Sequence, residues 1–333
     1  MSVASNGSPQ DAQPVSPSHS IWLQQSAQKL AGSLVIVAQP GHLGGSARSS
    51  TQFAADFSDG ANNSMSALSR SPPRRTSIQV SAPLFDHNLL AARRDRAATI
   101  GVETFLYDRA FEDCLDRLED IRGAFASTLL VGCPNPSWPK CLATGRIEVV
   151  DPGARMAGQA GGKQANIESL PFDAGQFDLC LCIGLLDTAN NLSLAAAALH
   201  LVLKPGGLLI GAIPGGQSLP RLRAAMLAAD SVAGQASPHV HPRIEPPALA
   251  RLLTEAGFAT PVIDVDRIDV AYRSLEALVR DLRAMGTTNV LNARSRRPLG
   301  RVARDAARAA FLNGHDRVTE QIEILHFAAW KPA

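Results

Sequence analysis

The sequence has few aromatic residues, no long apolar run and no excess of charge of one sign. Aromatic residues make up 5% of the chain, which contains only two tyrosines. A membrane-spanning helix needs about eighteen or more consecutive apolar residues, and no stretch of this sequence provides them. The 32 Lys and Arg residues nearly balance 30 Asp and Glu residues, which gives a net charge of +2. We therefore expect no transmembrane segment and no nucleic-acid partner.

Cysteine and metal-binding motifs are also scarce. Five cysteines in 333 residues are an odd and small number, so we expect no disulfide framework and a reducing compartment. His239 and His241 lie two residues apart, but no further ligand follows at a recognisable spacing. We expect no metal site, and the chain lacks the usual motifs of serine hydrolases, P-loop proteins and zinc proteases.

The first eighty residues differ from the rest of the chain. They are rich in Ser, Gly, Gln, Asn and Ala, and they contain five basic and three acidic residues. Such a segment buries too little apolar surface to offset its ordering entropy. We expect residues 1–80 to be a disordered N-terminal extension, and the alternative is an Arg- and Ser-rich transit peptide.

From residue 83 onward, apolar residues alternate between strand and helix spacing. The expected strands cover residues 127–131, 147–150, 177–183, 208–213, 262–270 and 322–330. The expected helices cover residues 87–96, 105–120, 192–203, 219–232, 246–256, 274–285 and 301–312. Buried strands that alternate with helices predict an α/β fold with a mostly parallel, doubly wound sheet. The alternation of apolar and acidic residues over 262–270 is typical of a strand near a sheet edge.

Three motifs stand out in this part of the chain: Leu170-Pro171-Phe172, Phe177-Asp178-Leu179 and Leu203-Lys204-Pro205-Gly206-Gly207. They resemble motifs of the class I S-adenosylmethionine-dependent methyltransferases. The string from Asp281 to Asn289 resembles more specifically the complex I assembly factors of this fold, the arginine hydroxylase subgroup, and their bacterial relatives. The resemblance implies a Rossmann-like sheet of seven strands with helices on both faces and a helical insert before the last strand. It also implies a methyltransferase-like domain over 83–333, with a cofactor half at 125–215 and a client or substrate half at 216–333.

The resemblance assigns five residues to a cofactor site for S-adenosylmethionine. Gly132 lies in the loop that faces the methionine moiety, and Asp151 stands where the family's acid bonds the ribose hydroxyls. Asn166 and Ile167 fall where the family binds adenine, and Gly184 follows the strand at the mouth of the pocket. A carboxylate suits a ribose diol because it accepts two hydrogen bonds, although an Asp-Pro-Gly sequence also forms a turn without any ligand.

The glycine loop departs from the family pattern of an acid followed by Gly-x-Gly. Leu130 stands in place of the acid and Pro134 in place of the second glycine. Pro134 and Pro136 remove two backbone N–H donors and fix two φ angles. Two interpretations remain open, a weakened cofactor loop and a rigid strand-to-helix turn that binds nothing.

Two residues are candidates for catalysis. Asp187 and Thr188 occupy the position where relatives usually carry His-Trp, near the mouth of the pocket. Asp187 could serve as a base, but the pattern favours a solvated carboxylate that leads into a helix. His239 matches the subgroup and is the candidate for the rim of the pocket, while a plain loop role remains the alternative.

An arginine-rich segment follows the strand that ends near residue 270. Its members are Arg280, Arg283, Arg294, Arg296, Arg297, Arg301 and Arg304. The pattern favours a solvated basic insert, and the alternative is a face for an acidic protein partner or a nucleic-acid backbone. A protein client is the interpretation that agrees with the resemblance.

The resemblance leaves three functions open. The chain could methylate a protein client with S-adenosylmethionine, hydroxylate an arginine of a complex I subunit during assembly, or serve as a non-catalytic scaffold of the methyltransferase fold. Peripheral contact with a membrane is compatible with all three functions. We expect a cytoplasmic location if the protein is bacterial and the mitochondrial matrix if it is eukaryotic.

Overall fold

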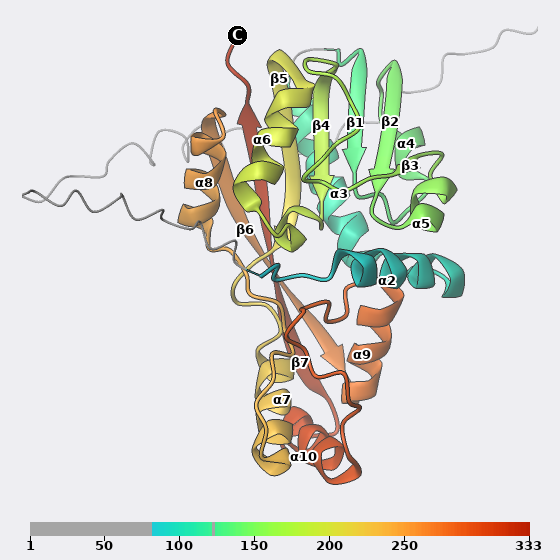
Figure 1. Cartoon of the computed structure of the whole chain (residues 1–333), viewed down its shortest axis with the longest axis vertical. Coiled ribbons are helices and arrows are strands. Elements are labelled where there is room, and N and C mark those ends of the chain that lie inside the picture. The colour runs from blue at the N-terminus through green and yellow to red at the C-terminus, as the bar shows by residue number, and fades with distance from the viewer. Residues whose placement is uncertain (1–81, 122–123) are drawn as a thin grey trace, which may run out of the picture. The chain divides into compact units, whose positions relative to one another are not determined.

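The computed structural model describes residues 82–121 and 124–333. The expected N-terminal extension, residues 1–80, lies outside the described residues. The described part forms a seven-stranded sheet with helices on both faces (Figure 1). This arrangement confirms the α/β fold and the seven-stranded sheet of the methyltransferase class.

The strands of the sheet are ordered β3-β2-β1-β4-β5-β7-β6. Their bounds are β1 Ser127–Val131, β2 Arg146–Asp151, β3 Lys163–Gln164, β4 Phe177–Ile183, β5 Leu203–Pro214, β6 Ala259–Tyr272 and β7 Val318–Trp330. The first five strands in sequence pair in parallel, whereas β7 is antiparallel to both β5 and β6. The strand expected near an edge, β6, is the edge strand itself.

Each face of the sheet carries its own hydrophobic core because successive side chains of a strand point to opposite faces. On β4, Leu179 and Leu181 belong to one core, whereas Cys180 and Cys182 belong to the other. The first core includes residues of α3 (Phe105–Asp120) and α4 (Trp138–Cys141). The second includes residues of α6 (Leu192–Val202) and α8 (Pro246–Glu255).

Helix α2 (His87–Ile100) lies across the edge of the sheet at which β1, β2 and β4 end (Figure 1). The Asp86 side chain caps its N-terminus by accepting a hydrogen bond from the Leu89 backbone N–H at 2.9 Å. The helix packs against α5 (Ala154–Gln159) and α9 (Leu275–Ala284). Open α/β sheets bind ligands at the carboxyl ends of their strands, so α2 covers the edge where a ligand would bind.

Strands β6 and β7 continue past the end of β5 as a two-stranded ribbon. The pairing of β5 with β7 stops at Pro214 and Ile324, while β6 and β7 remain paired as far as Tyr272 and Val318. Three helices accompany the ribbon, α7 (Pro220–Ala233), α9 and α10 (Arg301–Leu312) (Figure 1). The expected helical insert before the last strand is therefore confirmed as α9 and α10.

The sequence patterns missed the shortest elements. Strand β3 has two residues, α4 has four and α5 has six, which are too few for a periodic pattern to emerge. The segment Lys204 to Gly207, which separates the expected helix over 192–203 from the expected strand over 208–213, lies inside β5. The register between β4 and β5 shifts here, and Gly206 adopts φ +73° while its N–H bonds to the Lys331 carbonyl at 3.0 Å. The segment is an irregularity within a strand, which glycine permits.

None of the described helices is both long and apolar enough to cross a membrane. Over the same residues, no group of three or more His, Cys, Asp and Glu side chains is placed to hold a metal ion.

Candidate functional site

The carboxylate at the end of β2 has a partner within the protein. Arg94 of α2 donates from Nε to Asp151 Oδ1 at 2.7 Å and from Nη2 to Oδ2 at 2.5 Å. The side chains of Arg94 and Asp151 are 1% and 0% exposed. This two-pronged geometry is the one in which a guanidinium binds a carboxylate most strongly.

The remaining hydrogen-bonding capacity of Asp151 is also used by the protein. Oδ1 accepts the Gly153 backbone N–H at 2.9 Å, and Oδ2 accepts the Cys133 backbone N–H at 3.3 Å. Burial is the largest single effect and lowers the pKa of Arg94, but the charges and hydrogen bonds of Asp151 and Tyr107 together raise the pKa above its ordinary value. Arg94 is therefore cationic, and both carboxylate oxygens are bonded to the chain itself.

The residues expected near adenine are engaged in a similar way. The Asn166 amide lies 3.1 Å from Nδ1 of His87, and its Oδ1 accepts the Glu168 backbone N–H at 3.0 Å. Nε2 of His87 in turn lies 3.2 Å from the carbonyl oxygen of Thr188. Ile167 is buried at 5% exposure in the hydrophobic core. His87 thus joins α2 to the loops after β3 and β4.

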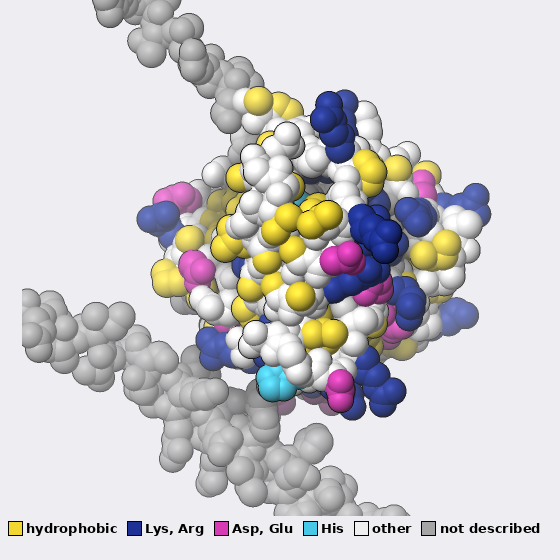
Figure 2. All heavy atoms as spheres, turned by 90° about the horizontal axis from the view of Figure 1, so that it is seen from below, with side chains coloured by type: hydrophobic (Ala, Val, Ile, Leu, Met, Phe, Trp, Pro, Cys, Tyr) yellow, Lys and Arg dark blue, Asp and Glu magenta, His cyan; other side chains and the backbone are white. Residues whose placement is uncertain are grey.

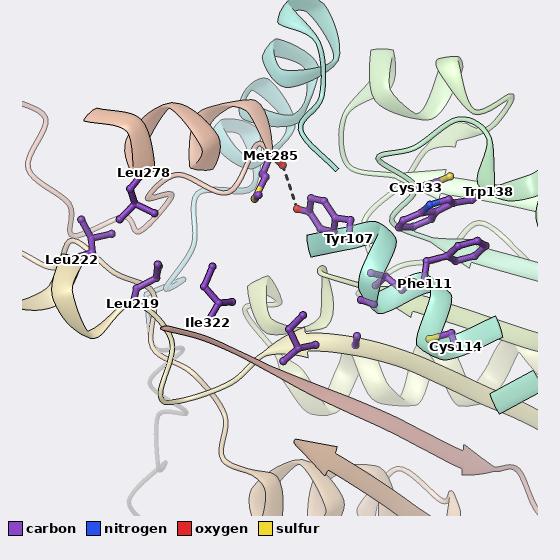
Figure 3. Packing of buried hydrophobic residues seen from close by; sticks show 14 of the residues in the cluster. Tyr107, Phe111, Cys114, Cys133, Trp138, Leu219, Leu222, Leu278, Met285 and Ile322 are labelled. Atoms are coloured by element: carbon purple, nitrogen blue, oxygen red, sulfur yellow. Dashed lines mark hydrogen bonds between the residues drawn. The ribbon is translucent and has the colours of Figure 1, made fainter. Parts of the chain in front are cut away.

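Both expected glycines adopt positive φ values and lie against neighbouring residues. Gly132, at φ +84°, has no room for a Cβ atom, which would lie 2.5 Å from the Ile183 carbonyl oxygen. At Gly184, φ is +66° and a Cβ atom would lie 2.8 Å from Cε1 of Tyr107. Tyr107 of α3 is buried, and its hydroxyl donates to the Met285 carbonyl at 3.2 Å (Figure 3). The ring therefore occupies the space in front of Gly184.

These contacts test whether S-adenosylmethionine fits the described residues. The ribose would need the carboxylate oxygens that Arg94 holds, and the methionine end would need the backbone N–H donors that the two prolines of the loop lack. Two cavities of about 110 and 320 Å³ lie at this edge, and both have Leu90 and Thr188 in their walls. Because the Asp151 oxygens are bonded to Arg94 and the loop lacks two N–H donors, the described residues do not offer these contacts to the cofactor.

The smaller cavity is mostly apolar but contains a buried ion pair. Arg243 donates from Nη1 to Oδ2 of Asp187, and their side chains are 9% and 4% exposed. The expectation of a solvated Asp187 carboxylate was wrong, because the loop that carries Arg243 covers it. Burial raises the pKa of Asp187. Oδ1 of Asp187 and Nε of Arg243 are buried without a hydrogen-bond partner among the described residues.

The two histidines of the 237–242 segment have different environments. His241 lines the small cavity, and its Nε2 accepts the Val290 backbone N–H at 3.0 Å. Burial, followed by the charge of Arg243, lowers the pKa of His241 to about 3, so the ring is neutral. His239 is instead bonded to Asp230 at 2.8 Å and lines a separate groove. The sequence indicates His239 as the candidate for the rim of the pocket, but His241 lies on the wall of the small cavity.

Sequence reasoning also missed Arg94, Tyr107 and Arg243. Each comes from an element outside the strand ends to which the family motifs point: α2, α3 and the loop after α7. The only sequence signal for Arg94 was its place in the helix expected over 87–96, where a charged residue is expected to face solvent. Its burial could be found only from the tertiary structure.

Two comparisons with known proteins agree with the architecture. Residues 129–211 match the family model described as methyltransferase domain. A malonyl-[acyl-carrier protein] O-methyltransferase of Laribacter hongkongensis is 34% identical over 171 residues, which are 51% of this chain and 56% of that enzyme. The chain therefore matches only about half the length of that relative.

A longer match extends beyond the methyltransferase domain. The mitochondrial arginine-hydroxylase NDUFAF5 of Danio rerio is 30% identical over 271 residues, covering 75% of this chain and 83% of that protein. Among solved structures, the YcgJ protein of Bacillus subtilis covers 67% of this chain and 98% of its own, with 11% identity and a TM-score of 0.47.

Proposed function

This chain belongs to the methyltransferase-fold family of arginine-hydroxylase NDUFAF5, and from this membership we propose that it assists the assembly of respiratory complex I by holding a protein client. In this proposal the chain is a non-catalytic scaffold with respect to methyl transfer. It acts in the cytoplasm if the protein is bacterial and in the mitochondrial matrix if it is eukaryotic.

The Arg94–Asp151 pair is the observation that carries this proposal. A bidentate ion pair with both side chains almost fully buried resists displacement, because removing one partner leaves an uncompensated buried charge. A bound nucleoside would have to move Arg94 and α2 together. The fold is thus retained while the carboxylate that was expected to bind a ribose is bonded to the protein itself, and this supports a binding role over methyl transfer.

The family match supports a protein client but does not name it. The similarity extends over 75% of this chain, well past the matched methyltransferase domain at 129–211. Outside the matched methyltransferase domain, the chain has the ribbon of β6 and β7 and the helices beside it. These elements extend past the end of β5 and offer surface for a client.

A calorimetric titration of the full chain with S-adenosylmethionine and S-adenosylhomocysteine tests the non-catalytic part. We expect no saturable binding up to about 1 mM ligand, the concentration that corresponds to roughly 4 kcal/mol of binding free energy. Arg94→Ala and Asp151→Asn variants, checked for folding by circular dichroism, serve as controls. Micromolar binding to the wild type that is lost in Asp151→Asn would contradict the proposal and restore the methyltransferase interpretation.

Deletion of the gene tests the assembly part. We expect the complex I content to fall, and to return when either the wild type or the Asp151→Asn variant is supplied, provided that the variant accumulates. Unchanged complex I content after deletion would contradict the assembly role.

Arginine hydroxylation is a second candidate, because the NDUFAF5 relatives are named arginine hydroxylases. Mass spectrometry of complex I subunits from wild-type and deletion strains separates the two functions. The scaffold proposal expects every arginine-containing peptide to keep its mass after deletion. Loss of an oxygen atom from one such peptide would support hydroxylation instead.

A further inference from the structure

A groove of about 840 Å³ lies beside α2 and shares Thr288 with the wall of the small cavity. Its walls come from α2, α9, the segment 286–300 and the segment after α7. The walls are joined by hydrogen bonds, because Asn289 Nδ2 donates to the Pro238 carbonyl at 2.7 Å and the Asp86 N–H donates to the Val290 carbonyl at 2.8 Å. The groove is therefore a formed feature of the fold.

Five arginines line this groove, namely Arg93, Arg283, Arg294, Arg296 and Arg297. Of these, only Arg294 has an acidic neighbour among the described residues, Asp86 at 3.6 Å. The other acid in the wall, Asp230, is bonded to His239 at 2.8 Å. Four guanidinium groups thus face one groove without a carboxylate partner in residues 82–121 and 124–333.

Arg93 is the most constrained of these arginines. Its Nε is buried and has no hydrogen-bond partner within the described part of the chain. Burial lowers the pKa of Arg93, and the positive charges of Arg96, Arg294 and Arg283 lower it further. An unsatisfied donor among like charges costs free energy, and an anion bound in the groove would remove that cost.

We propose that this groove binds an acidic segment of a protein, with carboxylates of the segment paired to the arginines and its apolar side chains on the apolar part of the wall. The groove is large enough for several side chains rather than for one small anion. Carboxylate groups match the planar fork of arginine in a bidentate way.

The composition of the wall decides between a peptide and a nucleic acid. Apolar residues such as Val279, Leu299 and Pro298 line the same groove as the arginines, and no Phe, Tyr or Trp is among the lining residues. Single-stranded nucleic acid is bound mainly by stacking of its bases on aromatic side chains, which this wall lacks. Figure 2 views the end of the molecule that carries α7, α9 and α10, and its Lys and Arg side chains gather mainly on one side, beside hydrophobic side chains.

The chain's own first eighty residues are a poor occupant on grounds of charge. Their five basic and three acidic residues give a net charge of +2, a sign that does not complement a groove lined by arginines. The acidic segment therefore belongs to another protein. That this other protein is the client rests on the proposed function.

Fluorescence anisotropy with the full chain tests the groove directly. The probe is a fluorescein-labelled peptide of glutamate, alanine and leucine, compared with a peptide that has lysine in place of glutamate and with an oligodeoxynucleotide. We expect the acidic peptide to bind, the affinity to fall as salt is raised, and the lysine peptide not to bind. Failure of the acidic peptide to bind, or equal binding of the oligodeoxynucleotide, would overturn the proposal.

A matched pair of double variants locates the binding. Arg283→Glu/Arg296→Glu reverses two charges in the groove, and we expect at least about a tenfold loss of peptide affinity. Lys140→Glu/Arg155→Glu reverses two exposed charges outside the groove, and we expect less than about a twofold loss. Equal losses in both variants would show non-specific attraction and overturn the site. Peptide affinity tests the groove, whereas complex I content tests the proposed function. The two proposals can therefore fail independently of each other.

Discussion

Two buried ion pairs stand at the carboxyl ends of the strands, Arg94–Asp151 and Arg243–Asp187. Their surroundings differ, although both are desolvated. Asp151 gains two backbone N–H donors besides its arginine, whereas Asp187 keeps one oxygen without a partner. A buried pair offsets its desolvation only when its remaining hydrogen-bonding groups are satisfied. Arg94–Asp151 is therefore a stable closure, and Arg243–Asp187 retains capacity for a polar group in the small cavity.

The neutral ring of His241 makes stability depend on pH. Its pKa falls from 6.5 in the unfolded chain to about 3 in the folded chain, because the ring is buried and Arg243 is close. Between these values the unfolded chain binds the additional proton, so stability falls as the pH falls below about 6.5. We expect the free energy of unfolding to decrease by up to about 1.4 kcal/mol per pH unit through this group.

Urea denaturation of the wild type and of His241→Gln between pH 6.5 and about pH 4.5 measures this effect. The glutamine can still accept the hydrogen bond of the Val290 N–H but does not titrate. We expect the wild type to lose stability more steeply than the variant. Parallel pH dependences of the two proteins would contradict the assignment.

At the scale of elements, α2 and α3 close the edge of the sheet from two directions. Helix α2 brings His87 and Arg94 to Asn166 and Asp151, while α3 brings Tyr107 to Gly184. Side chains on one face of a helix recur every three or four residues, and the step of seven from His87 to Arg94 places both on the same face. The edge of the sheet is thus closed by the positions of the two helices, and no single side chain closes it alone.

The N-cap of α2 provides a test at this scale. We expect Asp86→Ala to lower the free energy of unfolding by about 1 kcal/mol, because the Leu89 N–H loses its acceptor. Asp86→Asn keeps an acceptor oxygen and removes only the charge opposite Arg294, so a smaller loss is expected. Chemical denaturation measures both variants, and equal losses would show that the charge rather than the cap is responsible.

At the scale of the whole described domain, one hydrophobic core continues from the sheet into the ribbon. The same cluster contains Trp138, stacked on Phe111 beside the sheet, and Phe311 of α10 beside the ribbon (Figure 3 shows the part around Trp138). Because close-packed residues share their contacts, the ribbon and the sheet are expected to unfold together.

Phe311→Ala tests this continuity. The side chain is fully buried, so its removal should cost about 3–5 kcal/mol. We expect tryptophan fluorescence, to which Trp138 contributes, and far-ultraviolet circular dichroism to shift to the same lower denaturant midpoint. A fluorescence midpoint that stays at the wild-type value would indicate that the two parts unfold separately.

The sequence alone determined the architecture and the family. The spacing of apolar residues is local information, and it predicted the long strands, most helices and the insert of α9 and α10, while motifs such as the string from Asp281 to Asn289 indicated the subgroup. The loop prolines already showed that donors were missing near Gly132.

Only the tertiary structure decided what faces each expected site residue. Arg94 and Asp151 are 57 residues apart, Tyr107 and Gly184 are 77, and Asp187 and Arg243 are 56. A helical pattern assigns arginine to the solvent side because a lone buried charge is unfavourable. That rule fails when a distant carboxylate is brought within hydrogen-bond distance, and such pairings depend on how the chain packs rather than on local spacing.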